Sequence, residues 1–182
     1  MSPPDGSIDG APNGFASLDA FHRSVLDRVA ELKALVAAVE AGDVTTEMRA
    51  CAAAIAQVLG ADARRHHEDE ERHVFPTLLA SGDSTLIQPV LVLQQDHHWL
   101  ELDWRELEPH VAAIATGYGT LDIDVLREGA AILATLYQEH ISLEESLVYP
   151  EARRRIGPGA LGEMTREMLA RRRAEQRRRS SP

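Results

Sequence analysis

The sequence predicts an all-α protein, an up-down antiparallel four-helix bundle with an additional C-terminal helix. Apolar residues recur at helical spacing along four successive stretches of the 182-residue chain. Short connections join these stretches, which favours antiparallel neighbours. Aromatic residues make up only 4% of the chain, whereas Ala, Leu and Val are abundant. This composition favours packed helices over a sheet, and the length is that of one domain with a substantial core.

Each predicted helix follows one apolar stripe and ends at a glycine-containing stop signal. The four stripes cover residues 18–39, stopping at 41–43; 52–78, stopping near 81–83; 86–114, stopping at Gly117 and Gly119; and 126–147, stopping near 157–159. Pro76 and Pro150 are expected to kink or end the second and fourth helices. Pro89 falls in the first turns of the third helix, where proline is tolerated.

Composition divides the chain into three parts. Residues 1–15 are rich in Pro, Gly and Asp and are predicted to be disordered. Residues 16–157 form the predicted bundle, and residues 158–182 form an arginine-rich helix or tail, helical over roughly residues 160–178. The single cysteine, Cys51, excludes an internal disulfide framework and is expected to fill the core near Ile55.

Charge is distributed unevenly along the chain, whose formal net charge is -10. Residues 1–150 carry 25 acidic and nine basic side chains, whereas residues 151–182 carry ten arginines and four acids. An acidic body argues against a broad nucleic-acid face, so no DNA partner is expected. The arginine runs at 171–173 and 177–179 are interpreted as a solvated helix end, with contact to RNA or acidic lipid as the alternative.

Nothing in the sequence predicts a membrane or secreted protein. No apolar run approaches the length of a membrane span, and the N-terminal residues lack the apolar stretch of a signal peptide. Together with the cysteine usage, these features predict a soluble, cytoplasmic protein.

The chain contains an internal repeat that carries its most specific chemical signal. Residues 66–76 read HHEDEERHVFP and residues 140–150 read HISLEESLVYP, an offset of 74 positions. In each copy a histidine precedes a glutamate by four residues, which places both side chains on one helix face. The repeat aligns His66 with His140 and Glu70 with Glu144, and a parallel offset of 75 aligns His22 with His97.

Each of the four stripes therefore has a histidine where an apolar residue is expected, and two also contain a carboxylate. A single such histidine is more often a satisfied core residue than a ligand. Four together, with two acids whose burial unpaired would be very costly, indicate a metal site. Nitrogen and carboxylate donors suit iron, manganese or zinc, and the duplicated half-site suggests two ions. The ferritin-like pattern has the glutamate first and a shorter spacing, so that class is excluded.

These paired H-x-x-x-E motifs, each followed by Phe-Pro or Tyr-Pro, resemble the hemerythrin-like HHE cation-binding domains. The resemblance covers residues 17–156. It implies a four-helix bundle with a non-haem centre of two iron ions, with manganese or zinc as possible substitutes. It further implies that four imidazoles are terminal ligands, those of His22, His66, His97 and His140, and that Glu70 and Glu144 are bridging carboxylates.

The sequence departs from the oxygen-carrying members of this family at one position. They have a second histidine one turn after that of the third helix, where this chain has Glu101. Glu101 is predicted as a further metal ligand, with a position at the rim of the site as the alternative. A carboxylate-rich environment stabilises ferric iron and disfavours reversible oxygen carriage.

Other polar residues near the motifs receive different interpretations. His67 and His98 are expected to face polar sides of their helices, His110 to lie on the surface, and His73 to be a conceivable spare ligand. Glu71 and Glu145 are interpreted either as hydrogen-bond partners of ligand imidazoles or as exposed acids. Tyr137 is assigned to the core, with a hydroxyl facing a bound ligand as the alternative.

The leading functional hypothesis is a non-haem di-iron protein that binds oxygen, peroxide or nitric oxide, for sensing, iron handling or oxidative-stress response. One alternative is a di-iron oxidase or peroxidase, and another is a helical interaction module with a purely structural metal. A sensor would need a separate protein partner. The sequence does not specify the oligomeric state.

Overall fold

The computed structural model describes residues 13–179, and this part of the chain is helical, with short connections and no strand. The predicted all-α class is therefore confirmed. Among these residues, no helix combines the length and apolar character needed to cross a membrane. The elements are α1 (Gly14–Ala41), α2 (Thr46–Ala56), η1 (Gln57–Asp62), α3 (Ala63–His73), α4 (Phe75–Leu79), α5 (Ser84–Thr116), α6 (Ile123–Leu143), η2 (Glu144–Val148), α7 (Tyr149–Arg155) and α8 (Pro158–Arg179).

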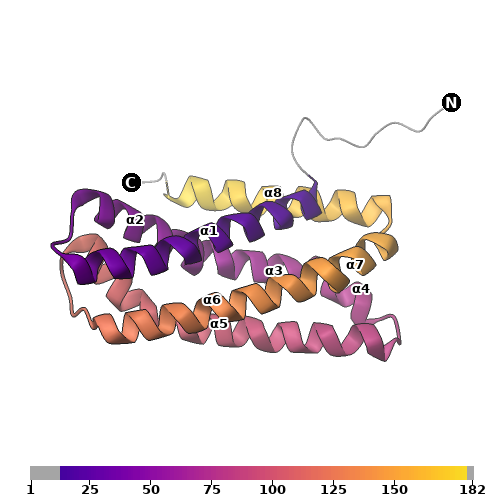
Figure 1. Cartoon of the computed structure of the whole chain (residues 1–182). Helices are drawn as coiled ribbons and strands as arrows, with labels where there is room; N and C mark the ends of the chain where they lie inside the picture. Colours follow the sequence, from indigo (N-terminus) through magenta and orange to yellow (C-terminus); the bar gives the residue numbers. More distant parts are fainter. Residues whose placement is uncertain (1–12, 180–182) are drawn as a thin grey trace.

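Four long segments lie side by side along a common axis: α1, the chain from α2 to α4, α5, and the chain from α6 to α7 (Figure 1). Both α1 and α5 contact α2 and α6, so each of these two segments lies against the second and the fourth, which also meet through α4 and α7. The eighth helix, α8, runs back along the outside of this assembly and contacts α1 (Figure 1).

Local sequence explains where the helices begin and end. Asn13, Asp83 and Asp122 precede α1, α5 and α6, and each side chain accepts a hydrogen bond from a backbone N–H two or three residues later. At the other end of α5, Gly117 adopts φ 76°, a left-handed conformation that favours glycine. The stop signals near 41–43, 81–83, 117 and 157–159 each follow a helix end, as predicted.

The second and fourth segments are interrupted where the sequence places proline. Val74 separates α3 from α4, and Pro76 lies in the first turn of α4. Pro150 lies in the first turn of α7, directly after the π-helical η2. The second segment contains another π-helix, η1, which lies before the repeat at 66–76, whereas η2 lies within the repeat at 140–150. Each π-helical turn uses one more residue than an α-helical turn, so both elements shift the register of the residues beyond them.

The buried apolar residues form two clusters. One joins α1, α2, α5 and α6 through residues such as Leu32, Ile55, Leu107 and Leu133. The other lies toward the opposite end of the segments and includes Leu18, Phe75, Leu93 and Tyr149. On all four segments, a layer of buried histidines and acids lies between the residues of these two clusters.

The helix α1 begins at Gly14, so the last two residues of the segment that was predicted to be disordered are helical. Gly14 and Phe15 are helical and buried, because the Gly14 N–H donates to Thr165 Oγ1 at 3.0 Å and Phe15 packs edge-on to Tyr149. A Cβ at Gly14 would lie 2.8 Å from the side chain of Met164, so α1 and α8 are in close contact there. The rest of the disorder prediction, residues 1–12, lies outside the described residues.

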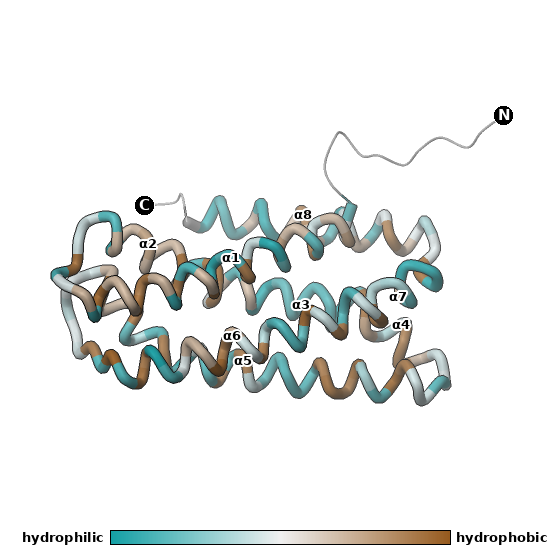
Figure 2. The backbone as a smooth tube through the Cα atoms, viewed as in Figure 1, coloured by the Kyte–Doolittle hydropathy of each residue, from teal (hydrophilic) through white to brown (hydrophobic). Residues whose placement is uncertain are grey.

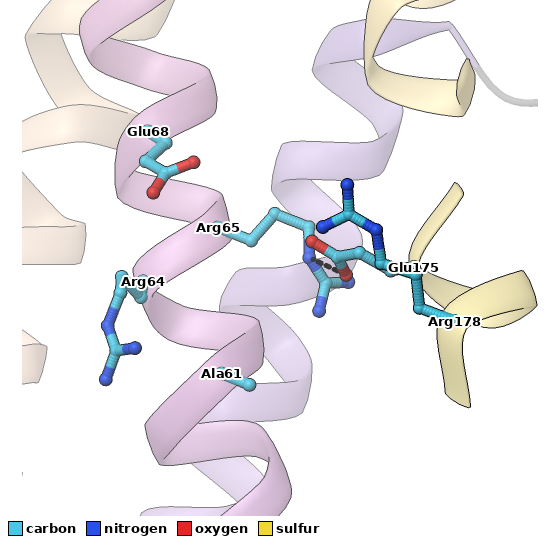
Figure 3. Close-up of a pocket in the computed structure, with 6 residues that line it drawn as sticks. All are labelled: Ala61, Arg64, Arg65, Glu68, Glu175 and Arg178. Atoms are coloured by element: carbon cyan, nitrogen blue, oxygen red, sulfur yellow. Dashed lines mark ion pairs between the residues drawn. The ribbon is translucent and has the colours of Figure 1, made fainter. Parts of the chain in front are cut away.

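The expected fifth helix is present as α8, and it becomes hydrophilic toward its C-terminal end (Figure 2). Its arginines are not simply solvated. Arg171 donates to the carboxylate of Asp69, a side chain that is almost fully buried, and Arg172 lies beside the same group. Further along, Arg65 of α3 pairs with Glu175 at 2.8 Å across a groove between the two helices (Figure 3). These ion pairs hold α8 against α3.

Two adjacent residues of α6 test the packing of the larger apolar cluster. Leu133 is fully buried in it, whereas its neighbour Ile132 is 59% exposed. Leu133→Ala should lower the free energy of unfolding by about 2–5 kcal/mol, because it leaves a cavity. The matched change Ile132→Ala should alter it by no more than about 0.5 kcal/mol. Chemical denaturation of both variants gives the comparison, and equal losses would contradict the assigned orientation of α6.

Candidate metal centre

Four imidazoles and two carboxylates meet inside the protein, and none of the six side chains is more than 6% exposed. Each long segment contributes at least one of them. Their positions are His22 on α1, His66 and Glu70 on α3, His97 on α5, His140 on α6, and Glu144 at the start of η2. The structure thus brings together six of the seven residues that the sequence singles out.

Each carboxylate lies between imidazoles from two different segments. The Oε1 atom of Glu70 is 3.3 Å from His66 Nε2, and its Oε2 atom is 3.3 Å from His97 Nε2. The Oε1 atom of Glu144 is 3.3 Å from His140 Nε2, and its Oε2 atom is 3.1 Å from His22 Nε2. This is the arrangement expected of two carboxylates that bridge a pair of sites.

The donor atoms define two overlapping groups, each compact enough for one cation. His22 and His66 with both glutamates form one group, and His97 and His140 with both glutamates form the other. Within each group, the donor atoms lie within 4.8 Å of one another. The two glutamates belong to both groups, so two cations would share them.

The second nitrogen of several imidazoles is held by an acid outside the groups. His22 Nδ1 is 3.0 Å from Glu145 Oε1, and His97 Nδ1 is 2.8 Å from Glu71 Oε1. His140 Nδ1 faces Asp96 at 3.6 Å. A carboxylate on Nδ1 fixes the ring and leaves Nε2 as the donor toward the centre. Glu71 and Glu145 therefore match the hydrogen-bonding alternative rather than that of free exposed acids.

Tyr149 also belongs to the site. The sequence marked this residue only as part of the repeat and gave it no role. Its hydroxyl donates to Glu70 Oε1 and lies 3.1 Å from His22 Nε2. Burial, with the charge of Glu70 second, raises the pKa of Tyr149 well above its usual range, so the phenol remains a donor. At the equivalent repeat position, Phe75 stacks on His97 with ring centroids 5.5 Å apart. The aromatic residue before each repeated proline is thus a signal for this contact.

His67 is not the polar-facing residue that the sequence predicted. Its side chain is 9% exposed, and its ring stacks on that of His97 at 4.0 Å with an interplanar angle of 11°. With His97 and His140 it forms a third compact group of donor atoms. The prediction was wrong because it took the exposed Arg64 to define the side of the helix on which His67 lies, whereas the buried side of α3 is wide enough to include both His66 and His67.

Glu101 lies outside every such group among the described residues, contrary to its prediction as a ligand. Its side chain is 45% exposed, 3.6 Å from Arg64 Nε and 3.5 Å from Arg105 Nη2. The buried stripe of α5 continues from His97 through Leu100, and so turns away from position 101. Glu101 therefore corresponds to the alternative, a residue at the rim.

The remaining histidines and Tyr137 are placed as follows. His73 faces Glu167 of α8 at 3.6 Å and belongs to none of the groups. His98 is exposed, and His110 accepts a hydrogen bond from the Asp122 N–H at the connection between α5 and α6. Tyr137 is buried in the core beside the site, in agreement with the preferred interpretation.

Electrostatics favour protons on the imidazoles when no metal competes for them. Burial alone would lower the pKa of His22, His97 and His140, but the facing carboxylates outweigh it and raise all three, that of His140 to about 10. Burial would likewise raise the pKa of Glu70, but the charge of the facing His66 outweighs it and holds the pKa well below its usual range. His67 differs, since burial and the neighbouring His97 and His66 lower its pKa well below 6.5.

The buried donor atoms fit a pair of cations. Among the residues of the two cation groups, three imidazole Nε2 atoms, Glu70 Oε2 and both oxygens of Glu144 are buried and lack a hydrogen-bond partner within the described residues. The three imidazoles are those of His66, His97 and His140. Leaving such groups unsatisfied costs stability, and divalent cations bound to imidazole and carboxylate donors would satisfy them.

Metal binding should therefore release protons. Metal ligation needs neutral imidazoles, so cations must displace protons from His22, His97 and His140, whose pKa values are raised. The apparent affinity for zinc should increase with pH and level off near the raised pKa of His140, about 10. Calorimetric zinc titrations at pH 7, in two buffers with different ionisation enthalpies, measure the proton count. The exposed His98→Ala variant should leave that count unchanged, and a binding enthalpy that does not depend on the buffer would contradict proton release.

Comparison with known proteins agrees with this geometry. No curated protein and no solved structure matches the chain significantly. The model of one family, described as the hemerythrin HHE cation binding domain, matches residues 13–152. That range contains every residue of the two cation groups, as well as Tyr149, and covers most of the chain. The chain belongs to the family of hemerythrin HHE cation-binding domains.

Proposed function

We propose that this protein holds two iron ions between the four long segments of an up-down antiparallel bundle and binds a small oxidant there. The candidate ligands are oxygen, peroxide and nitric oxide. The observation that carries the proposal is the pair of fully buried glutamates, each facing imidazoles from two segments. Mixed nitrogen and carboxylate donors suit iron, with manganese or zinc as substitutes.

We further propose His67 in place of Glu101 in the ligand set. One ion would be held by His22 and His66, the other by His97 and His140 with His67, and Glu70 and Glu144 would be shared. A neutral His67 suits this role, since its lowered pKa leaves one ring nitrogen unprotonated at pH 7 and available to a metal. When bound, the iron pair supplies the sites for coordinating and reducing a small ligand.

The protein's own groups position the donors and exclude water. Glu71 and Glu145 orient the imidazoles of His97 and His22 through their Nδ1 atoms. The Tyr149 hydroxyl donates to Glu70 and fixes the carboxylate between its two neighbours. The apolar clusters on either side of the polar layer keep it dry, which strengthens the electrostatic interactions inside.

The biological use that we propose is sensing, iron handling or defence against oxidative stress. An oxidase or peroxidase is the second candidate. It is favoured by the buried Tyr149 phenol, an oxidisable group in direct contact with the site. The two candidates differ in turnover: a binding protein reaches a stable ligand complex, whereas a peroxidase consumes excess peroxide continuously.

Iron loading tests the ligand set. Wild-type protein reconstituted anaerobically with ferrous iron should contain two iron ions per chain by elemental analysis. Glu70→Ala should lose most of both ions because it removes a shared donor, whereas His67→Ala should lose mainly one. His98→Ala, on the next residue after His97 and exposed, is the matched control and should retain both. Full loading of Glu70→Ala would refute the shared-carboxylate arrangement.

Ligand binding tests the function. The near-ultraviolet and visible spectrum of the diferric protein should change on adding azide or peroxide, and that of the diferrous protein on adding nitric oxide. Glu101→Ala should keep both ions and these responses, because Glu101 lies at the rim. If the spectra of fully loaded protein do not change on adding any of the three ligands, a structural metal would be favoured instead.

A further inference from the structure

A small cavity of about 20 Å³ lies beside the candidate metal centre, and most of the residues that line it are not candidate ligands. It has room for one water-sized molecule. Its walls come from η1, α3, α5 and α6, and they are formed by Leu59, Gly60, Ala63, Arg64, His67, Leu100, Glu101, Trp104 and Tyr137. Because His67 also belongs to the group of donors with His97 and His140, the cavity adjoins that half of the centre.

The inner wall has an unpartnered polar group. Trp104 is only 3% exposed, yet its Nε1 atom has no hydrogen-bond partner within the described residues. That atom faces the Gly60 wall, since a Cβ at Gly60 would lie 3.2 Å from it. A buried N–H left without an acceptor is unfavourable, and a small hydrogen-bond acceptor in the cavity would satisfy it.

The cavity depends on a glycine at position 60, where a larger side chain would occupy part of it. Gly60 lies in η1, the π-helical turn that directly precedes α3 and His67. π-helical turns are rare in proteins, and those that occur are often found at functional sites. At 3.2 Å, a methyl group on Gly60 would be in tight contact with the indole nitrogen of Trp104, so any larger residue there would narrow the cavity.

The outer end of the cavity is closed by exposed charges. Arg64 and Glu101 both line it, and their side chains lie 3.6 Å apart. Arg64 points away from α8, on the opposite side of α3 from Arg65 (Figure 3). Glu101 also contacts Arg105 at 3.5 Å. All three side chains are 45–67% exposed, and such surface pairs are weak, so they can open readily.

We propose that this cavity is the entry passage and holding pocket for a small hydrogen-bond-accepting ligand of one or two heavy atoms. The Trp104 indole N–H donates to the ligand, His67 adjoins it on the side of the centre, and the Arg64–Glu101 pair covers the outside. The inference rests on the proposed function, which it deepens by giving the ligand a route and a size limit.

Nitric oxide, an uncharged diatomic, is the kinetic probe. Its association with and dissociation from the diferrous protein are followed by stopped-flow absorbance, in variants that are first shown to contain two iron ions. Gly60→Ala should slow both rates by narrowing the passage. Glu101→Ala should speed both by removing the cover, whereas Glu106→Ala, an exposed acid of α5 away from the cavity, should change neither.

The holding role is tested at Trp104. Trp104→Phe retains the buried ring and removes only the N–H. It should raise the dissociation rate of nitric oxide about fivefold, the loss expected for one hydrogen bond. Gly60→Ala and Trp104→Phe thus act in opposite directions on dissociation, which a general loss of stability would not produce.

A second measurement needs no iron. In zinc-loaded protein labelled with ¹⁵N-tryptophan, the Trp104 indole N–H should show a nuclear Overhauser effect to a long-lived bound water. Gly60→Ala should abolish it, and Glu106→Ala should not. The Trp99→Phe background assigns the signal.

The outcomes separate the two claims. Nitric oxide rates that are equal in all variants would overturn the pocket and leave the proposed function standing, as would an indole without a bound water. Fully iron-loaded wild-type protein that fails to bind nitric oxide, azide or peroxide would overturn both.

Discussion

The structure depends on two carboxylates that are buried completely and face imidazoles on both sides. Two isolated anions in a helical core would be very unfavourable, and each would be expected to take up a proton instead. Here Glu70 pairs with His97 of α5, and Glu144 pairs with His22 of α1. The Tyr149 hydroxyl connects the two pairs by donating to Glu70. The polar layer is therefore a cross-link between segments as much as a candidate metal centre.

The surrounding fold can be understood as support for that layer. Two apolar clusters enclose it, and acids on neighbouring turns orient its imidazoles. The helix α8 adds a further contact, because Arg171 pairs with the buried Asp69, the residue directly before Glu70. Burial raises the pKa of Asp69 while the two arginines act in the opposite sense. The C-terminal helix is in this way attached to the same turn of α3 that carries the bridging carboxylate.

The sequence was sufficient for the all-α class, and it singled out six side chains that the structure brings together in the polar layer. Histidines such as His22 interrupt an apolar stripe. For His66 and His140 the signal is stronger, because they align in two copies of a motif that are 74 positions apart. Position 67 was misassigned because periodicity marks the centre of a buried helix side but not its width, and the buried side of α3 includes His67 next to His66. Glu101 has the ligand spacing from His97, but the buried stripe of α5 turns away from it, so we propose His67 in its place. Contacts between distant segments, such as that of Tyr149 with Glu70, depend on packing that periodicity does not specify.

The most direct test of this account is a crystal structure of the iron-loaded protein with anomalous diffraction measured on both sides of the iron absorption edge. Two iron peaks are expected in the polar layer, both within bonding distance of Glu70 and Glu144. One should also lie next to His22 and His66, and the other next to His97 and His140. A single peak, or peaks that contact neither glutamate, would contradict it.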